Sequence, residues 1–228
     1  MDGAPHVQPC SRVVCVGDLH GNMDETRQLW SNLEAHFSKN GDSAALTRAT
    51  VVFLGDYCDR GPETKAVLDW LLHLRDQRSQ EPLSGGTYFV CGNHDWSFAS
   101  FLGCPPLAPG LTPSAAQLDS TTPQVALASG TGYYTHEVQE GMHYQGRRWG
   151  GSLIYNADHT FRSYGVHVQG GSGGSGHDWA AAPRERQALR SAVPSSHSDF
   201  LASLSWVVDL PVAFPPGRMV CVHAGTSE

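Results

Sequence analysis

Acidic, amide and imidazole side chains gather in four short motifs, and each motif lies at the end of a run of apolar residues. The motifs are GDLHGN (17–22), GDYCDRGP (55–62), GNHD (92–95) and VHAG (222–225). Carboxylate and amide oxygens, together with imidazole nitrogens, are the ligands that first-row divalent ions take. The glycines allow the backbone to approach such an ion closely. The four motifs therefore predict a centre for a pair of divalent metal ions.

Any one of these motifs has an ordinary structural explanation. Asp18 can be a turn residue ahead of the helix expected from residue 23, and Asp56 can be an acid in a loop. Such explanations do not account for four motifs in one order, each at the end of an apolar run. We therefore interpret the motifs as parts of one site.

The apolar runs and the stretches between them predict alternating strands and helices. Helices are expected over 23–37 and over 63–74, the second of which follows the helix-starting Pro62. This alternation predicts an α/β fold with a layered parallel sheet, whose carboxyl-end loops form the natural ligand crevice. Each apolar run is expected to be a buried parallel strand, and the runs are 13–16, 51–54, 88–90 and 219–222.

The stretch 103–182 is rich in Gly, Pro, Ser and Thr and has only short apolar groups. We interpret it as a long insertion that shapes substrate access, within a single domain that spans 11–228. Inside it, the segment QGGSGGSG (169–176) is typical of a linker. The segment HYQGRRWG (143–150) mixes aromatic residues with two arginines and is expected to be ordered.

Composition excludes several classes of protein. Apolar residues make up 40% of the 228-residue chain, which excludes a wholly disordered protein. The 15 basic and 22 acidic residues give a net charge of −7, which disfavours nucleic acid as a partner. Neither a membrane-spanning run nor the basic start of a secretory signal is present, so the cytoplasm is the expected location, with the nucleus left open. The six cysteines include no CxxC pair and are expected to be reduced, mostly buried thiols.

The four motifs match the metallophosphoesterase signature GDxHG, GDxxDRG, GNHD/E and HAG/HGG, and the chain resembles the phosphoprotein phosphatase family. Four further segments are similar to the Rhizobiales-like phosphatases, a bacterial-type branch associated with phosphotyrosine activity: GDYCDRGPET (55–64), FLG (101–103), HYQGRRWGG (143–151) and SLIYNADHTFRSYGV (152–166). The resemblance implies a metallophosphoesterase-type layered β-sandwich flanked by helices.

The resemblance also implies a set of metal ligands. Asp18 and His20 would bind the first ion, Asp56 would bridge the two ions, and Asn93 and His223 would bind the second. The cofactor would be two divalent ions, Mn, Fe or Zn, with Mn preferred. A hydroxide shared between the ions would attack the phosphorus in line.

The proton donor and phosphate contacts follow from the same resemblance. His94 would protonate the leaving oxygen, and Asp59 would orient His94. Arg60 carries the planar fork that suits two phosphate oxygens, and Asp95 is expected to hold that fork in place.

A second phosphate contact is expected from the GRRW segment. Arg147 and Arg148 are the candidates, because a phosphate dianion beside one arginine keeps oxygens available for others. A solvated or ion-paired surface pair is an equally good interpretation of these two residues.

The chain departs from the family pattern at its end. The family has one more metal-ligating His on a later strand, whereas this sequence ends three residues after Gly225. We expect the C-terminal strands to be missing, a sheet edge or core face to be exposed and the second metal site to be weakly occupied. A fragment, a truncated gene model and a splice form remain open. The other histidines are not convincing replacements: His136, His143, His159, His167, His177 and His197.

Three functions remain open at this point. The first is a metal-dependent phosphoprotein phosphatase that hydrolyses phosphomonoesters, with phosphotyrosine preferred and a phosphoprotein as its partner. The second is a dinucleoside polyphosphatase-like hydrolase, against which the HYQGRRWGG segment argues. The third is an inactive fragment that binds phosphate. The oligomeric state is left open.

Overall fold

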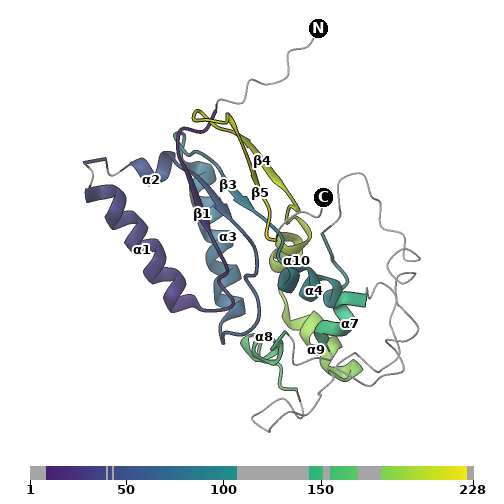
Figure 1. Ribbon diagram of the computed structural model, residues 1–228. Helices are drawn as coiled ribbons and strands as arrows, with labels where there is room; N and C mark the ends of the chain where they lie inside the picture. The colour runs from purple at the N-terminus through teal and green to yellow at the C-terminus, as the bar shows by residue number, and fades with distance from the viewer. Residues whose placement is uncertain are drawn as a thin grey trace.

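A parallel sheet forms the centre of the protein in a computed structural model that describes residues 9–39, 41–42, 44–106, 144–150, 155–168 and 181–224 (Figure 1). Within these residues the sheet has three strands in the order β1 (Val13–Val16), β2 (Thr50–Phe53) and β3 (Thr87–Phe89). Val14 pairs with Val51, and Val52 pairs with Tyr88. The predicted α/β class is thus confirmed.

The two faces of this sheet pack against different partners. In β2, Val51 and Phe53 face a core shared with the helices α1 (Met23–Lys39) and α3 (Thr64–Gln80). Val52 points to the opposite face and joins a second core with Val208 and Leu210. Successive side chains of a strand point to opposite faces, so this continuously buried strand contributes to both cores. The short helix α2 (Ala45–Arg48) leads into β2.

The prediction of a parallel strand over 219–222 is wrong in its direction. This run forms β5 (Arg218–Cys221), which pairs antiparallel with β4 (Val208–Pro211) in a separate two-stranded sheet. Only a short turn joins β4 to β5, and a parallel pair would need a crossover of a dozen or more residues. The apolar run alone carried no information about the direction of its neighbour.

Most of the remaining helices lie together at one end of the molecule (Figure 1). The helix α4 (Asn93–Leu102) packs closely against α7 (Tyr144–Gly150). Gly146 permits this close approach, since a Cβ atom at this position would lie only 2.6 Å from the backbone nitrogen of Phe101. None of the helices in the described ranges is both long and apolar enough to cross a bilayer. The other helices at this end are α8 (Asp158–Ser163), α9 (Pro183–Ala192) and α10 (Ser195–Ala202).

The described parts of 103–182 contribute to the main core. Trp149 of α7 and Phe161 of α8 have no exposed surface and pack into the same core as the sheet. Of the segment 143–150, which is expected to be ordered, residues 144–150 form helix α7, and residue 143 and the linker-like segment 169–176 lie outside the described residues.

All six cysteines lie in the described ranges, and none of them is in a disulfide there. Cys58, Cys91 and Cys221 are buried, and Cys15 is exposed.

His197 links three helical segments through two hydrogen bonds. Its ring has no exposed surface, and its Nε2 atom donates to the Asp69 carboxylate of α3 at 2.9 Å. Its Nδ1 atom then has a lone pair, which accepts the Tyr164 hydroxyl at the end of α8 at 2.8 Å. Burial lowers the pKa of His197, and Asp69 only partly opposes this effect. The ring therefore packs as a neutral bridge.

We expect the free energy of unfolding to decrease at acidic pH because His197 is buried as a neutral ring. Because the pKa of His197 is lowered on folding, the unfolded chain binds more protons than the folded chain as the pH falls. This contribution to stability is fully present above about pH 6.5, the usual His pKa, and decreases below it. Melting temperatures between pH 5 and 8 should show a smaller decline for His197→Asn than for the unmodified chain. The exposed His73→Asn is the control, and equal declines in all three proteins would contradict the prediction.

Candidate functional site

Backbone hydrogen bonds between loops bring the first two motifs together at the carboxyl ends of β1 and β2. The amides of Leu19 and His20 donate to the Asp56 carbonyl at 3.1 and 2.9 Å. In addition, the amide of Gly61 donates to the His20 carbonyl at 2.8 Å. This edge is where open α/β sheets bind their ligands.

Asp95 holds the second and third motifs together through hydrogen bonds to backbone amides. It has no exposed surface, and its Oδ2 atom accepts the amides of Asp56 at 2.7 Å and Gly92 at 3.0 Å. Its Oδ1 atom accepts the Tyr57 amide at 2.9 Å. Burial, with a smaller effect from the Asp56 carboxylate, raises the pKa of Asp95 to about 6. Asp95 thus contacts backbone amides, and among the described residues it forms no ion pair with Arg60, so the expectation that it holds the Arg60 fork is wrong.

A group of carboxylate and imidazole atoms surrounds Asp56. The Oδ2 atom of Asp56 lies 3.6 Å from His20 Nε2 and 3.4 Å from His223 Nε2. Asp18, whose side chain is half exposed, places its Oδ2 atom 3.6 Å from the same His20 nitrogen. Ligands that share one ion at about 2.1 Å are separated by roughly 3 to 3.5 Å. The spacing therefore fits a cation between these groups.

Both histidines of this group present the nitrogen that a metal needs. The Nδ1 atoms of His20 and His223 donate to the carbonyls of Cys58 at 2.9 Å and Leu54 at 2.8 Å. A carbonyl can only accept, so each Nε2 atom keeps its lone pair and faces Asp56. This backbone anchoring of the second ring nitrogen is typical of metal-ligating histidines. His20 Nε2 is also buried without a hydrogen-bond partner, so a divalent ion fits this donor set.

Asn93 is one of the two residues expected to bind the second ion. It is the first residue of α4, directly before His94, and its side chain is exposed. The roles of Asn93, Asp18 and the other predicted ligands remain predictions. The compact group of ligand atoms lies within 4.8 Å and consists of His20, Asp56 and His94.

His94 lies between a buried acid and an exposed base. Its Nδ1 atom donates to Asp59 Oδ2 at 2.8 Å, and its ring centroid is 4.7 Å from that of His20. Its Nε2 atom is 3.4 Å from a terminal nitrogen of Arg60, whose side chain reaches solvent. The structure thus brings His94, Asp59 and Arg60 together next to the metal-binding group, by which we mean Asp18, His20, Asp56 and His223.

The backbone around the site is strained. His20, Asp56, Asp59 and Arg60 all have positive φ angles, of 44°, 55°, 69° and 63°. Such conformations cost of order 1–3 kcal/mol each for residues other than glycine and concentrate at functional sites. The interloop hydrogen bonds and Asp95 offset this cost.

Three site residues were missed by sequence reasoning. Trp149 and Thr160 hydrogen-bond to Asp59, and the Tyr155 ring lies edge-on to His94 at 4.9 Å between centroids. All three lie in the segments HYQGRRWGG (143–151) and SLIYNADHTFRSYGV (152–166), in which only Arg147 and Arg148 had been singled out as site candidates. The similarity of these two segments to the Rhizobiales-like phosphatases was the feature of the sequence that could have indicated these residues.

The two arginines of α7 differ in their surroundings. Arg147 is buried, with 3% of its surface exposed, and Arg148 is half-buried. Burial excludes the solvated-surface interpretation for Arg147. A phosphate contact from either residue remains a prediction.

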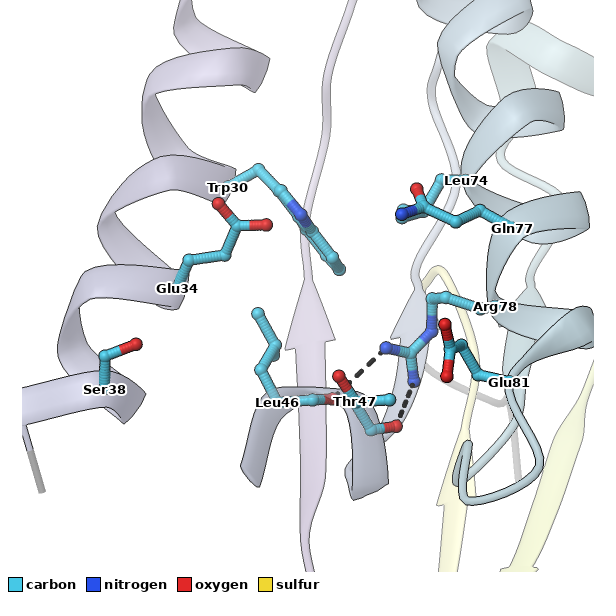
Figure 2. A pocket seen from close by; sticks show the side chains of 9 residues that line it. All are labelled: Trp30, Glu34, Ser38, Leu46, Thr47, Leu74, Gln77, Arg78 and Glu81. Atoms are coloured by element: carbon cyan, nitrogen blue, oxygen red, sulfur yellow. Dashed lines mark hydrogen bonds between the residues drawn. The ribbon is translucent and has the colours of Figure 1, made fainter. Parts of the chain in front are cut away.

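A cavity of about 310 Å³ lies away from this site, between α1, α2 and α3 (Figure 2). Trp30 and Glu34 of α1 line one side of it. Arg78 of α3 donates to the carbonyls of Leu46 at 3.1 Å and Ala49 at 2.6 Å. These carbonyls come just before β2, so the cavity lies at the amino ends of the strands and Arg78 serves to join α2 to α3.

Gly92 gives a test of how tightly the site is built. A Cβ atom at Gly92 would overlap the carboxylate and the amide of Asp56, whereas a Cβ atom at Gly17 would meet nothing within 4 Å. Gly92→Ala should destabilise the fold by about 1–3 kcal/mol and weaken metal binding, and Gly17→Ala should do neither. Melting temperature and elemental analysis measure both effects. Equal behaviour of the two variants would contradict this account of Asp56.

Comparison with known proteins agrees with the site. Residues 11–172 match the calcineurin-like phosphoesterase family. A segment of 83 residues is 29% identical to the bis(5'-nucleosyl)-tetraphosphatase PrpE [asymmetrical] of Oceanobacillus iheyensis and covers 36% of this chain. The match spans only 30% of that relative's length. With the family matched over most of the sequence, the chain belongs to the calcineurin-like phosphoesterase family of metal-dependent hydrolases.

Proposed function

We propose that the chain is a metal-dependent phosphoprotein phosphatase of the Rhizobiales-like branch that hydrolyses phosphomonoesters and prefers phosphotyrosine. The exposed guanidinium of Arg60, 3.4 Å from His94 Nε2 and beside the metal-binding group, carries this proposal. A phosphate-binding fork, a proton donor and a cation centre in one place are what hydrolysis of a phosphate ester requires. The HYQGRRWGG and SLIYNADHTF segments support the branch by resemblance.

In this proposal Arg60 binds the phosphate, and His94 and Asp59 act in proton transfer. Arg60 binds two phosphate oxygens with its planar fork. His94 Nε2 carries a proton to the leaving oxygen. Asp59 accepts a hydrogen bond from the Nδ1–H group of His94, which fixes the ring and stabilises the imidazolium form.

Two divalent ions complete the proposed site, with Mn²⁺ as the preferred metal. Asp18 and His20 would hold one ion, Asn93 and His223 the other, and Asp56 would lie between them. When bound, the ions lower the pKa of a water molecule and offset charge on the phosphoryl group.

A second candidate is hydrolysis of a dinucleoside tetraphosphate. The PrpE relative favours it, since that protein is a bis(5'-nucleosyl)-tetraphosphatase and its matched segment shares 29% identity with this chain. The two candidates differ in the leaving group, which is a tyrosyl or seryl oxygen in one case and a nucleotide in the other.

A substrate panel distinguishes the candidates. The Mn²⁺-loaded chain is assayed with a phosphotyrosine peptide, the same peptide with phosphoserine, and diadenosine tetraphosphate. We expect phosphate release to be fastest from the phosphotyrosine peptide. Faster cleavage of diadenosine tetraphosphate would replace this proposal by the second candidate. Binding of inorganic phosphate without turnover of any substrate would leave the inactive phosphate-binding alternative.

A further inference from the structure

The Asp59 carboxylate accepts hydrogen bonds from three side chains. Its Oδ2 atom accepts His94 Nδ1 at 2.8 Å and the Trp149 indole nitrogen at 2.8 Å. Its Oδ1 atom accepts the Thr160 hydroxyl at 2.6 Å. Asp59 has no exposed surface, so water does not supply these bonds.

The Thr160 hydroxyl is itself fixed by its neighbours. The Asp59 amide donates to it at 3.1 Å, and Thr64 at the start of α3 lies 2.9 Å away. The single proton of Thr160 is used on Asp59, so Thr64 is the donor in that last contact. Thr160 therefore contacts both the backbone and the side chain of Asp59.

Trp149 is equally constrained. Its indole is fully buried and stacks on Phe98 at 4.8 Å and on Phe161 at 5.3 Å between ring centroids. Stacked aromatic packing on two sides leaves the indole N–H a fixed direction, toward Asp59. The two donors come from α7 and α8, far in sequence from the acid they contact.

We infer that Trp149 and Thr160 are positioning residues that hold Asp59, and through it the His94 ring, in the orientation needed to protonate a leaving group. This inference rests on the proposed function. An isolated carboxylate can rotate about its last bond, and the His94 ring would then turn with it. The donors prevent that rotation because they occupy both oxygens. Burial raises the pKa of Asp59, and these hydrogen bonds oppose that rise only in part.

The test compares Thr160→Val, which keeps the shape but removes the hydroxyl, with Thr160→Ser, which keeps the hydroxyl. Substrates are phenyl phosphate and p-nitrophenyl phosphate, because a nitrophenol is the better leaving group and needs less protonation. For Thr160→Val we expect kcat on phenyl phosphate to fall about 10- to 100-fold, the range for outer partners of a site. KM should stay nearly constant, the loss on p-nitrophenyl phosphate should be smaller, and Thr160→Ser should recover most of the rate.

Trp149→Phe is the second variant and should show the same leaving-group dependence, so the test survives if Thr160→Val does not fold. Metal content and melting temperature are measured for every variant, and the metal content should not change. Equal losses on the two substrates, or no better rate for Thr160→Ser than for Thr160→Val, would overturn the inference while the unmodified chain remains active. If the unmodified chain hydrolyses neither substrate, the proposed function itself fails.

Discussion

Asp56→Asn is expected to remove metal binding more completely than any other single substitution. The Asp56 carboxylate lies within 3.6 Å of the Nε2 atoms of both His20 and His223, so its charge serves the whole group. Loss of even an outer partner costs 10- to 100-fold in metal affinity, and we expect a loss above about 100-fold here. The amide retains an oxygen for the His94 backbone amide, which donates to Asp56 Oδ1 at 3.0 Å, so the fold should survive.

Elemental analysis of the purified variant measures this effect. Asp76→Asn on α3 is the control, since its side chain is 60% exposed and lies away from the carboxyl ends of the strands, where the site is. Two ions per chain in Asp56→Asn would refute the proposed bridging role.

His94→Asn is expected to keep its metal and lose turnover. General acid catalysis contributes about 10²- to 10⁴-fold, and the loss should be larger for phosphoserine than for phosphotyrosine. The reason is the basicity of the leaving group, because a tyrosyl oxygen, with a pKa of about 10, needs less protonation than a seryl alkoxide.

Steady-state rates on matched phosphoserine and phosphotyrosine peptides measure the difference. The exposed His36→Asn on α1 serves as the control and should be as active as the unmodified chain. Equal losses on both peptides would show that His94 is not the acid, and loss of bound metal would show that it is a ligand.

The parallel sheet was predictable from sequence because its strands are short, apolar and separated by amphipathic helices. The prediction for β1 has the observed bounds, and β2 and β3 each begin one residue earlier than predicted. The glycine-containing motifs at their ends also identified the loops that meet at the site. These features depend on local periodicity, which a sequence displays directly.

The parts that sequence did not reveal depend on distant contacts. The hydrogen bond between Thr160 and Asp59 joins residues 101 positions apart, and the bond from Trp149 joins residues 90 apart. From sequence, Asp95 was assigned to the planar fork of Arg60, whereas in the structure the buried Asp95 accepts backbone amides. The direction of β5 depends on a short turn that its apolar pattern does not report.

The most direct test of the central claim is metal-dependent hydrolysis by the chain itself. The chain is stripped with a chelator and titrated with Mn²⁺, and bound metal and p-nitrophenyl phosphate hydrolysis are measured together. The account predicts no turnover without metal and a rate that rises as the metal binds, with neither response in Asp56→Asn. Turnover that persists in the stripped chain, or metal binding with no hydrolysis of any phosphoester, would contradict it.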